Sequence, residues 1–462
     1  MCELAAWFIS ATVIPFYDTL GEDSLEYIIE ETSLTTIIIQ NSCLQKVLNI
    51  KSKRKGQSLQ NLILLDPISD EDKREAKALE INVFPLQVII EAGRKSDHDL
   101  IPAQPETLSM LCYTSGTTGI PKGVKITQCG LLADVAGYYN LQWLHLVKQD
   151  IYFSYLPLAH VFEQLIINCA ICFGIRIGFY HGEIFKLTED LALLKPTYMA
   201  SVPRLFHKFY DLITAKMSST KGFKKKLITR AIKVKLENLE QTCSVHHYFY
   251  DKLVFNKIKK VLGGRLKLMI SGAAPISKDI LSFLKLCFCC PIVEGYGSTE
   301  SIGGVSITYP DDALTGHVGG VFSSCEIKLK DINEMNYRST DHPFPRGEVC
   351  YRGYSVMNGY FKHRDTTLQF IDSDGWVHSG DVGMFISGNR LEIFDRIKNI
   401  FKLQQGEYVA AEKLENIYIK SPFVSQIFVY GDSLKNFIVA VVLPEKDVVY
   451  NWAQMKGTGF SG

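Results

Sequence analysis

Short apolar runs recur along the chain, and longer stretches of mixed apolar and polar residues separate them. Short apolar runs are typical of buried strands, and the intervening stretches are long enough for crossover helices. The pattern therefore predicts an α/β fold with substantial parallel sheet. The predicted strands are residues 34–39, 62–65, 151–156, 266–270, 326–329 and 428–430.

The pattern changes twice toward the C-terminus. From residue 311 the strand signals are short and are broken by Gly, Pro and Asp, which indicates a compact β-rich subdomain. The last part combines a helical stretch at 411–420 with two strand-like runs near Ile427 and Ile438, so we expect a small α+β unit. The expected parts are α/β subdomains over 1–310, a β-rich subdomain over 311–397 and the α+β unit over 398–462. In the helix we expect Leu414, Ile417 and Tyr418 to face the interior, and Glu412, Lys413 and Glu415 to face solvent.

The composition fits a large folded protein and removes some classes of function. The 462 residues predict about three structural units at ~150 residues per domain. Lys plus Arg total 50 against 49 for Asp plus Glu, and the net charge of +1 gives no field that would attract nucleic acid. The 12 cysteines follow no regular spacing, which favours a reducing compartment. Cys287, Cys289 and Cys290 lack the paired spacing of a zinc site, so we expect buried thiols there.

The strongest chemical signal is the run from Tyr113 to Val124, Tyr-Thr-Ser-Gly-Thr-Thr-Gly-Ile-Pro-Lys-Gly-Val, directly after an apolar stretch. Its glycines let backbone N–H groups approach anionic oxygens, and its hydroxyls supply further donors or a metal ligand. Lys122 adds a mobile positive charge. The run is not a Walker A loop, because Gly-x-x-x-x-Gly-Lys-[Ser/Thr] cannot be aligned in it. It therefore predicts a phosphate-binding loop.

This run resembles the signature loop of the adenylate-forming superfamily, and further motifs occur in that family's order. Within the superfamily the chain is similar to long-chain fatty acid–CoA ligases of the animal type, over essentially all 462 residues. The resemblance implies an α/β adenylate-forming fold with two αβ sheet subdomains, a small β-rich subdomain and a partial α+β C-terminal lid. The further motifs are residues 155–163, 202–206, 271–275, 294–300, 334–337, 375–381 and 395–409.

The resemblance implies an ATP site assembled from several of these motifs. Tyr296, between two glycines, offers a flat face for adenine. Asp381 would accept hydrogen bonds from both ribose hydroxyls, although such a residue taken alone is more often part of a turn. The implied nucleotide contacts are Thr114, Ser115, Gly116, Thr117, Thr118, Gly119, Lys122, Gly272, Ala273, Ala274, Glu294, Gly295, Tyr296, Gly297, Thr299, Asp381, Arg396 and Lys402.

Lys122, His160, Thr299 and Glu300 are implied in catalysis. Thr299 would contact the α-phosphate, and Glu300 would ligate Mg²⁺ with the hydroxyl of Thr114. Without the other motifs, Thr299 and Glu300 would be interpreted as a helix-start cap and His160 as a packed core residue. With them, His160 is expected in the acyl-carboxylate site. Lys398 is expected at the hinge of the lid.

The implied reaction has two steps and uses ATP, Mg²⁺ and CoA. A long-chain fatty carboxylate attacks the α-phosphorus of ATP and gives acyl-AMP and pyrophosphate, and the CoA thiol then displaces AMP. No nucleic acid is expected as a partner, and a homodimer is left open. The resemblance implies the cytoplasmic face of the endoplasmic reticulum or the mitochondrial outer membrane. No apolar run reaches the ~20 residues of a membrane-spanning helix, so membrane contact is expected only through a missing N-terminal anchor or the surface.

The chain departs from the family pattern at both ends. Relatives begin before the position of Met1, and they carry a lysine near the lid's C-terminus that bridges the carboxylate and the α-phosphate. The sequence ends at Gly462, before that segment, so we expect impaired acyl-AMP formation. The alternative function is a truncated isoform or pseudoenzyme that binds nucleotide or acyl-adenylate. A peptide-synthetase adenylation domain is disfavoured because no carrier-protein domain follows.

Overall fold

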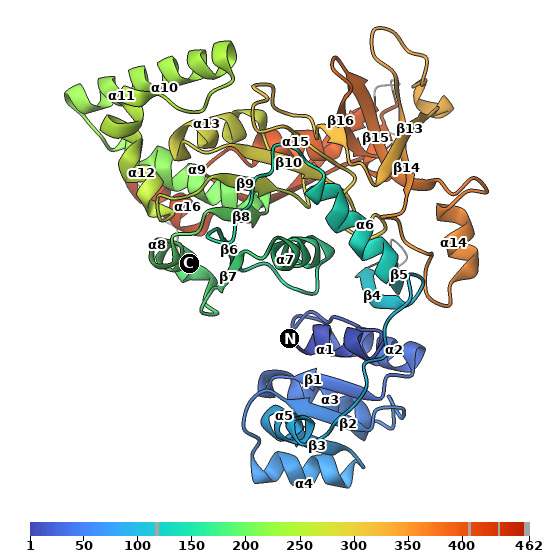
Figure 1. The fold of residues 1–462 in the computed structure, drawn as a ribbon. Coiled ribbons are helices and arrows are strands. Elements are labelled where there is room, and N and C mark those ends of the chain that lie inside the picture. The colour runs from blue at the N-terminus through green and yellow to red at the C-terminus, as the bar shows by residue number, and fades with distance from the viewer. Residues whose placement is uncertain (116–119, 405–407, 433–434, 457–462) are drawn as a thin grey trace. The chain divides into compact units, whose positions relative to one another are not determined.

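The computed structural model describes residues 1–115, 120–404, 408–432 and 435–456. The side chains of Ser115 and Lys402 lie outside this description as well. The chain forms two compact units, which are described separately (Figure 1). Unit 1 comprises Met1–Gln128 with Asn358–Arg364, and unit 2 comprises Cys129–Met357 with Asp365–Gly462.

Unit 1 contains a small parallel sheet in the order β1-β2-β3. Leucine and isoleucine side chains from these strands and from the adjoining helices form its buried core, which includes Ile29, Leu48 and Leu62. A separate antiparallel hairpin joins β4 to β5. The elements are α1 (Cys2–Phe8), α2 (Glu22–Thr32), β1 (Thr36–Ile39), α3 (Leu44–Ser52), β2 (Asn61–Leu64), α4 (Asp70–Ala78), β3 (Asn82–Pro85), α5 (Leu86–Arg94), β4 (Leu108–Ser115) and β5 (Pro121–Thr127).

A seven-stranded sheet forms the centre of unit 2, in the order β12-β11-β10-β9-β8-β6-β7. The five strands β6 to β10 are parallel, and β11 and β12 continue the sheet antiparallel at one edge. The strands are β6 (Ile151–Ser154), β7 (Arg176–Phe179), β8 (Tyr198–Ser201), β9 (Leu268–Ser271), β10 (Ile292–Tyr296), β11 (Ser306–Ile307) and β12 (Gly320–Val321).

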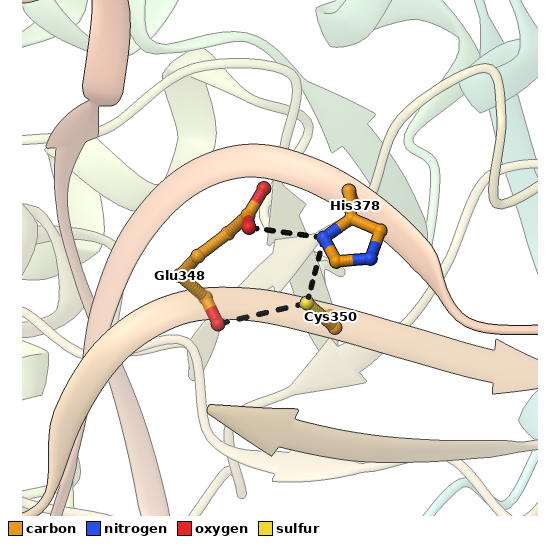
Figure 2. Close-up of side chains that lie close together, drawn as sticks. All are labelled: Glu348, Cys350 and His378. Carbon is orange, nitrogen blue, oxygen red and sulfur yellow. Dashed lines mark hydrogen bonds and ion pairs between the residues drawn. The ribbon is translucent and has the colours of Figure 1, made fainter. Parts of the chain in front are cut away.

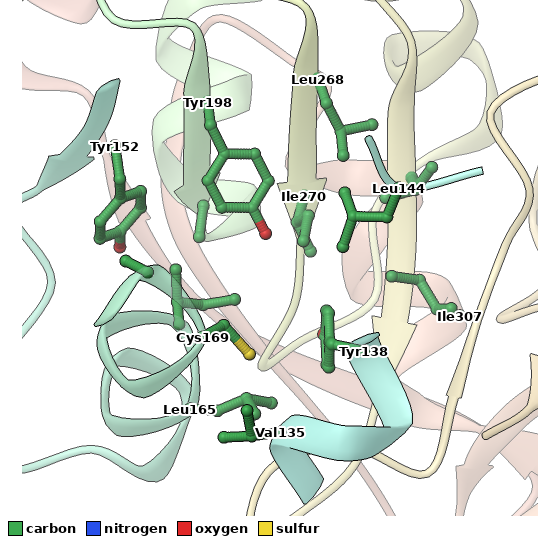
Figure 3. Packing of buried hydrophobic residues seen from close by; sticks show 14 of the residues in the cluster. Val135, Tyr138, Leu144, Tyr152, Leu165, Cys169, Tyr198, Leu268, Ile270 and Ile307 are labelled. Atoms are coloured by element: carbon green, nitrogen blue, oxygen red, sulfur yellow. The ribbon is translucent and has the colours of Figure 1, made fainter. Parts of the chain in front are cut away.

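Helices cover both faces of this sheet, because successive strand residues point to opposite sides and both sets are apolar. Tyr152, Tyr198 and Ile270 pack on one side against α6 (Gln128–Tyr139) and α7 (Val161–Phe173), as Figure 3 shows. Phe153 and Met199, their neighbours in the sequence, pack on the other side. The helices packed on that side are α8 (Leu187–Leu194), α9 (Pro203–Ser218), α12 (Asn256–Val261) and α13 (Lys278–Phe288). A second apolar cluster adds α10 (Gly222–Thr242) and α11 (Tyr248–Tyr250).

The remainder of unit 2 is an antiparallel sheet, β13-β14-β15-β16, followed by two strand pairs and their helices. A register shift between Glu348 and Cys350 and another between Val382 and Gly383 interrupt the ladders of β15. The elements are β13 (Cys325–Lys330), β14 (Arg346–Gly353), α14 (Arg364–Phe370), β15 (Val377–Ile386), β16 (Arg390–Arg396), β17 (Ile400–Lys402), β18 (Tyr408–Ala410), α15 (Ala411–Tyr418), β19 (Val424–Gly431), β20 (Ile438–Pro444) and α16 (Lys446–Lys456).

The six predicted strands are confirmed, since β1, β2, β6, β9, β13 and β19 overlap them. Cys287, Cys289 and Cys290 are buried, as expected. The division into compact units does not test the expected boundaries at 310/311 and 397/398, which stay predictions. Among the described residues, no helix combines the length and the apolar composition that crossing a membrane requires.

The predicted orientation of α15 is wrong at several positions. Ile417 and Tyr418 are 54% and 49% exposed. Glu415 faces β19 instead, where its Oε1 accepts the Val429 N–H at 2.7 Å, and Glu412 Oε1 accepts from the Asn399 side chain at 3.1 Å. Nearby amide donors therefore hold these carboxylates against the protein, and helical periodicity alone carries no sign of such donors.

Candidate nucleotide-binding site

A narrow pocket lies where the parallel strands of unit 2 end. Open α/β sheets bind ligands beyond the carboxyl ends of their strands, and β9 and β10 both end at this pocket. Its free volume is about 30 Å³. The lining residues are Tyr138, His160, Val161, Phe162, Gly272, Ala273, Gly295, Tyr296, Gly297, Ser298, Gly303, Gly304 and Ser306.

Close backbone approach explains the small residues in two of the pocket's loops. A Cβ on Gly297 would lie 2.0 Å from the carbonyl oxygen of Gly303, and a Cβ on Gly272 would lie 2.9 Å from the ring of Phe162. Ala273 has a φ of 69°, a left-handed conformation that is strained for alanine. Strained backbone of this kind gathers at ligand sites, and here it presents backbone groups to the pocket.

Tyr296 and Asp381 form the best-defined polar contact beside the pocket. Tyr296 ends β10, and its hydroxyl donates to Asp381 Oδ2 at 2.6 Å. Asp381 stands opposite Arg396 in the β15–β16 ladder, and Arg396 Nε lies 3.4 Å from Asp381 Oδ1. Burial raises the pKa of Asp381, while Tyr296 and Arg396 oppose the rise. The result is a buried carboxylate with one oxygen bound by a tyrosine and the other facing an exposed guanidinium.

Asp381 is placed inside a strand, not in a turn between strands. Gly380 precedes it within β15 with a φ of 73°, which a glycine adopts without strain. The Asp381 N–H donates to the Ser379 hydroxyl at 3.0 Å. This local distortion of the strand turns the carboxylate toward Tyr296.

Thr299 and Glu300 lie in the turn that follows β10. The Ile302 N–H donates to the Thr299 carbonyl at 3.1 Å, and the Met357 N–H donates to the Glu300 carbonyl at 2.8 Å. The described chain continues from this turn to β11 without a helix, so the two residues do not cap one. Both side chains are half-buried and carry hard oxygen donors, which fits the ligands that Mg²⁺ prefers.

His160 caps the N-terminus of α7 and lines the pocket. Its Nδ1 accepts the Phe162 N–H at 3.1 Å, so the neutral ring carries its proton on Nε2. Burial lowers the pKa of His160, which favours this neutral form. The ring can therefore donate one hydrogen bond from Nε2.

Several residues of unit 2 that the sequence assigns to the site do not line the pocket, namely Ala274, Glu294, Thr299, Glu300, Asp381 and Arg396. Glu294 is 7% exposed, and burial raises its pKa to about 7. Its carbonyl accepts the Thr308 N–H and its N–H donates to the Thr308 hydroxyl, both at 2.9 Å, directly after β11. Sequence reasoning did not assign seven of the lining residues to the site, and only the Gly303-Gly304 doublet offers a local signal. They are Tyr138, Val161, Phe162, Ser298, Gly303, Gly304 and Ser306.

The phosphate-binding run belongs to unit 1. Thr114 on β4 stands opposite Lys122 on β5, so the run is a hairpin connection, and Ser115 pairs with Pro121 through the backbone. Lys122 Nζ lies 5.9 Å from the centre of the Tyr360 ring. Gly116, Thr117, Thr118 and Gly119 lie outside the described residues, as does the side chain of Lys402.

Lys398 lies in a single 3-10 turn, Ile397–Asn399, between β16 and β17. This turn is the short connection between the β13–β16 sheet and the segments that follow it. The placement is compatible with a hinge, and the hinge role itself stays a prediction.

The arrangement of the strands, with a pocket beyond the ends of β9 and β10, is that of an adenylate-forming fold. Residues 1–361 match the family described as "AMP-binding enzyme", and the chain belongs to that family. It is 42% identical over 96% of its length to "Long chain acyl-CoA synthetase 7, peroxisomal" from Arabidopsis thaliana, and 39% identical over 98% to the human "Long-chain-fatty-acid--CoA ligase 6". The chain spans 63% and 65% of the lengths of these two relatives.

Solved structures agree with this assignment. The adenylation domain of a carboxylate reductase from Mycobacterium chelonae matches with a TM-score of 0.80 and 27% identity, over 98% of this chain and 68% of that one. An A-PCP didomain of a carboxylic acid reductase from Segniliparus rugosus, solved in complex with AMP, matches with a TM-score of 0.79 and 27% identity, over 99% of this chain and 61% of that one. The fold class expected from the sequence is therefore confirmed.

Proposed function

We propose that this chain carries the nucleotide- and acyl-binding parts of a long-chain fatty acid–CoA ligase. The reaction joins a fatty carboxylate to the α-phosphorus of ATP with loss of pyrophosphate, and then transfers the acyl group to the CoA thiol with loss of AMP. Membership of the AMP-binding family and the 38–42% identity to acyl-CoA synthetases support this proposal.

The observation that carries the proposal is the pairing of Tyr296 with Asp381 beside the glycine-lined pocket. A carboxylate accepts hydrogen bonds from two vicinal hydroxyls without offering a competing donor, which suits a ribose. Tyr296 fixes one carboxylate oxygen at 2.6 Å, and the ring itself lines the pocket as a surface for adenine. Arg396, whose side chain is 63% exposed, can move away from Asp381 Oδ1 and leave that oxygen to a ligand.

The remaining residues are proposed to orient the reacting groups, as positioning and charge neutralisation are the main tasks in nucleotide activation. His160 would donate from Nε2 to the acyl carboxylate, and Thr299 would donate to the α-phosphate. Lys122 would neutralise phosphate charge. Mg²⁺ would supply further neutralisation of the phosphates, with Glu300 as a proposed ligand.

Binding of AMP to Asp381→Asn tests the proposal directly. The amide keeps one acceptor and replaces the other with a donor, which we expect to cost about 1.5–3 kcal/mol, or roughly a tenfold to hundredfold rise in Kd. Asp374→Asn is the matched control, because Asp374 lies in an exposed turn of the same sheet region. Unchanged AMP affinity in Asp381→Asn would refute the assigned ribose contact.

The chemistry is tested by two single-turnover reactions, Mg·ATP with palmitate and preformed palmitoyl-AMP with CoA. Pyrophosphate release in the first and AMP release in the second support a complete ligase. AMP binding without either reaction supports the second candidate, a catalytically impaired nucleotide- or acyl-adenylate-binding form.

Association with the endoplasmic reticulum or mitochondrial outer membrane and a homodimeric state stay proposals, to be examined by fractionation and light scattering.

A further inference from the structure

Three potential ligand groups meet on the β13–β16 sheet, on the strands that lead to Asp381. Glu348 and Cys350 lie two positions apart on β14, and His378 pairs with Cys350 across the ladder to β15. Figure 2 shows the glutamate and cysteine side chains converging on one nitrogen of the imidazole. His378 Nδ1 lies 3.0 Å from Glu348 Oε2 and 3.5 Å from Cys350 Sγ, and all three ligand atoms lie within 4.8 Å of one another.

The hydrogen bonds available within the cluster leave the Cys350 thiol with either a long bond or one made at the expense of Glu348. If Nδ1 carries a proton, it donates to the Glu348 carboxylate, and the Cys350 thiol then has only the Glu348 carbonyl at 3.8 Å. If the thiol donates to Nδ1, the nitrogen has no proton left for the carboxylate. A cation bound by all three atoms would replace the long thiol contact with a direct bond to the sulfur.

The donor set points to a particular class of cation. An imidazole nitrogen, a thiolate and one carboxylate oxygen suit zinc, whereas Mg²⁺ and Ca²⁺ prefer oxygen ligands only. With the usual zinc bond lengths, neighbouring ligand atoms in a tetrahedral site lie roughly 3.3–3.6 Å apart. The observed separations of 3.0 and 3.5 Å lie close to this range, so small shifts of the side chains suffice.

The surroundings hold two of these ligands in place. The Gly380 N–H donates to Glu348 Oε1 at 3.2 Å, which leaves Oε2 for the cluster. Asp372 Oδ2 lies 3.4 Å from His378 Nε2, and a carboxylate on the distal nitrogen is the usual outer partner of a metal-bound histidine. Cys350 is fully buried, while Glu348 and His378 keep a small exposed edge through which an ion can enter.

We propose that Glu348, Cys350 and His378 form a zinc-binding site, with a fourth position for water. Binding displaces the thiol proton, because the thiolate is the ligand. Protons compete with the ion for the thiolate, so affinity increases with pH. The bound ion would tie β14 to β15 just before Gly380 and Asp381.

Titration of the metal-free full chain with Co²⁺ tests the site, since Co²⁺ bound by a thiolate gives a charge-transfer band. We expect one equivalent to bind, Zn²⁺ to displace it, and the band to be lost in Cys350→Ser. Cys325→Ser is the matched control, because Cys325 is a buried cysteine on β13 of the same sheet. Asp372→Asn keeps the three ligands and should weaken Co²⁺ binding about tenfold to a hundredfold.

Zinc K-edge absorption on the one-to-one complex of the unmodified chain provides a readout that does not depend on any variant folding. The proposal expects one sulfur neighbour and otherwise nitrogen or oxygen neighbours. A shell of two or more sulfurs would place the ion at Cys287, Cys289 and Cys290 and would overturn the proposal. Absence of stoichiometric binding, or a Co²⁺ band that persists in Cys350→Ser, would overturn it as well.

Discussion

Glu163 is a buried acid whose ionisation should make the stability of unit 2 depend on pH. It lies in the first turn of α7, fully buried, and accepts hydrogen bonds from Tyr152 at 2.5 Å and from Ser154 at 2.6 Å, both on β6. Burial raises its pKa from 4.5 to about 7, even though the two hydroxyl donors favour the charged form. The folded protein therefore holds this proton at pH values where the unfolded chain has released it.

The sign and size of the effect follow from this pKa. Between pH 4.5 and about 7 the folded state binds more protons than the unfolded state, so the free energy of unfolding falls as the pH rises. The contribution is fully present below pH 4.5 and is lost as the pH passes through 7. At 1.36 kcal/mol for each pH unit, the total is about 3 kcal/mol.

Glu163→Gln should remove this dependence, because the amide is neutral at every pH and fits the same space. We expect the stability of Glu163→Gln relative to the unmodified chain to rise between pH 5 and pH 8, by about 2.5 kcal/mol. Urea unfolding followed by far-UV circular dichroism at several pH values measures the difference. Glu240→Gln on the exposed face of α10 is the control. A Glu163→Gln difference that stays constant over this range would refute the reasoning.

Two further predictions concern the candidate nucleotide site. Tyr296→Phe leaves Asp381 Oδ2 without its 2.6 Å donor and should lower the unfolding free energy by about 1–3 kcal/mol, measured by urea unfolding. Gly297→Ala should abolish AMP binding measured by calorimetry, because its Cβ would lie 2.0 Å from the Gly303 carbonyl oxygen. Gly295→Ala is the control, because the atom nearest to its Cβ would be 3.9 Å away, and it should keep its stability. An equal loss of AMP affinity in both alanine variants would contradict the steric argument.

The central sheet could be predicted from the sequence because its strands are buried on both faces. Residues 151–154 and 268–271 are apolar on both sides of the strand, so a short continuous run is a sufficient signal. The two-residue strands β11 and β12 give no such signal, since their pairing follows from the loop after β10 and not from their own composition. The faces of α15 were also predicted wrongly because residues outside the element decide its contacts. The Val429 N–H on β19 determines where Glu415 points.

The site was predictable as a set of motifs and not as a set of contacts. The resemblance named Tyr296 and Asp381, but 85 positions separate them, and their hydrogen bond depends on how β15 is distorted at Gly380. Whether the hairpin residues Thr114 and Lys122 act on the same ligand stays a prediction, since they belong to the other compact unit.

Burial, which the sequence does not display, decides which polar residues acquire unusual chemistry. Glu163 follows His160 within one apolar stretch, and residue type alone suggests nothing more than a helix-start acid. Only its position beneath β6, facing two hydroxyls, gives it a pKa of about 7. Cys350 and His378 are likewise 28 positions apart, and the strand register alone brings them together. The pH dependence and the proposed zinc site therefore both depend on side-chain contacts that the fold creates. Nothing in the sequence near these residues predicts the contacts.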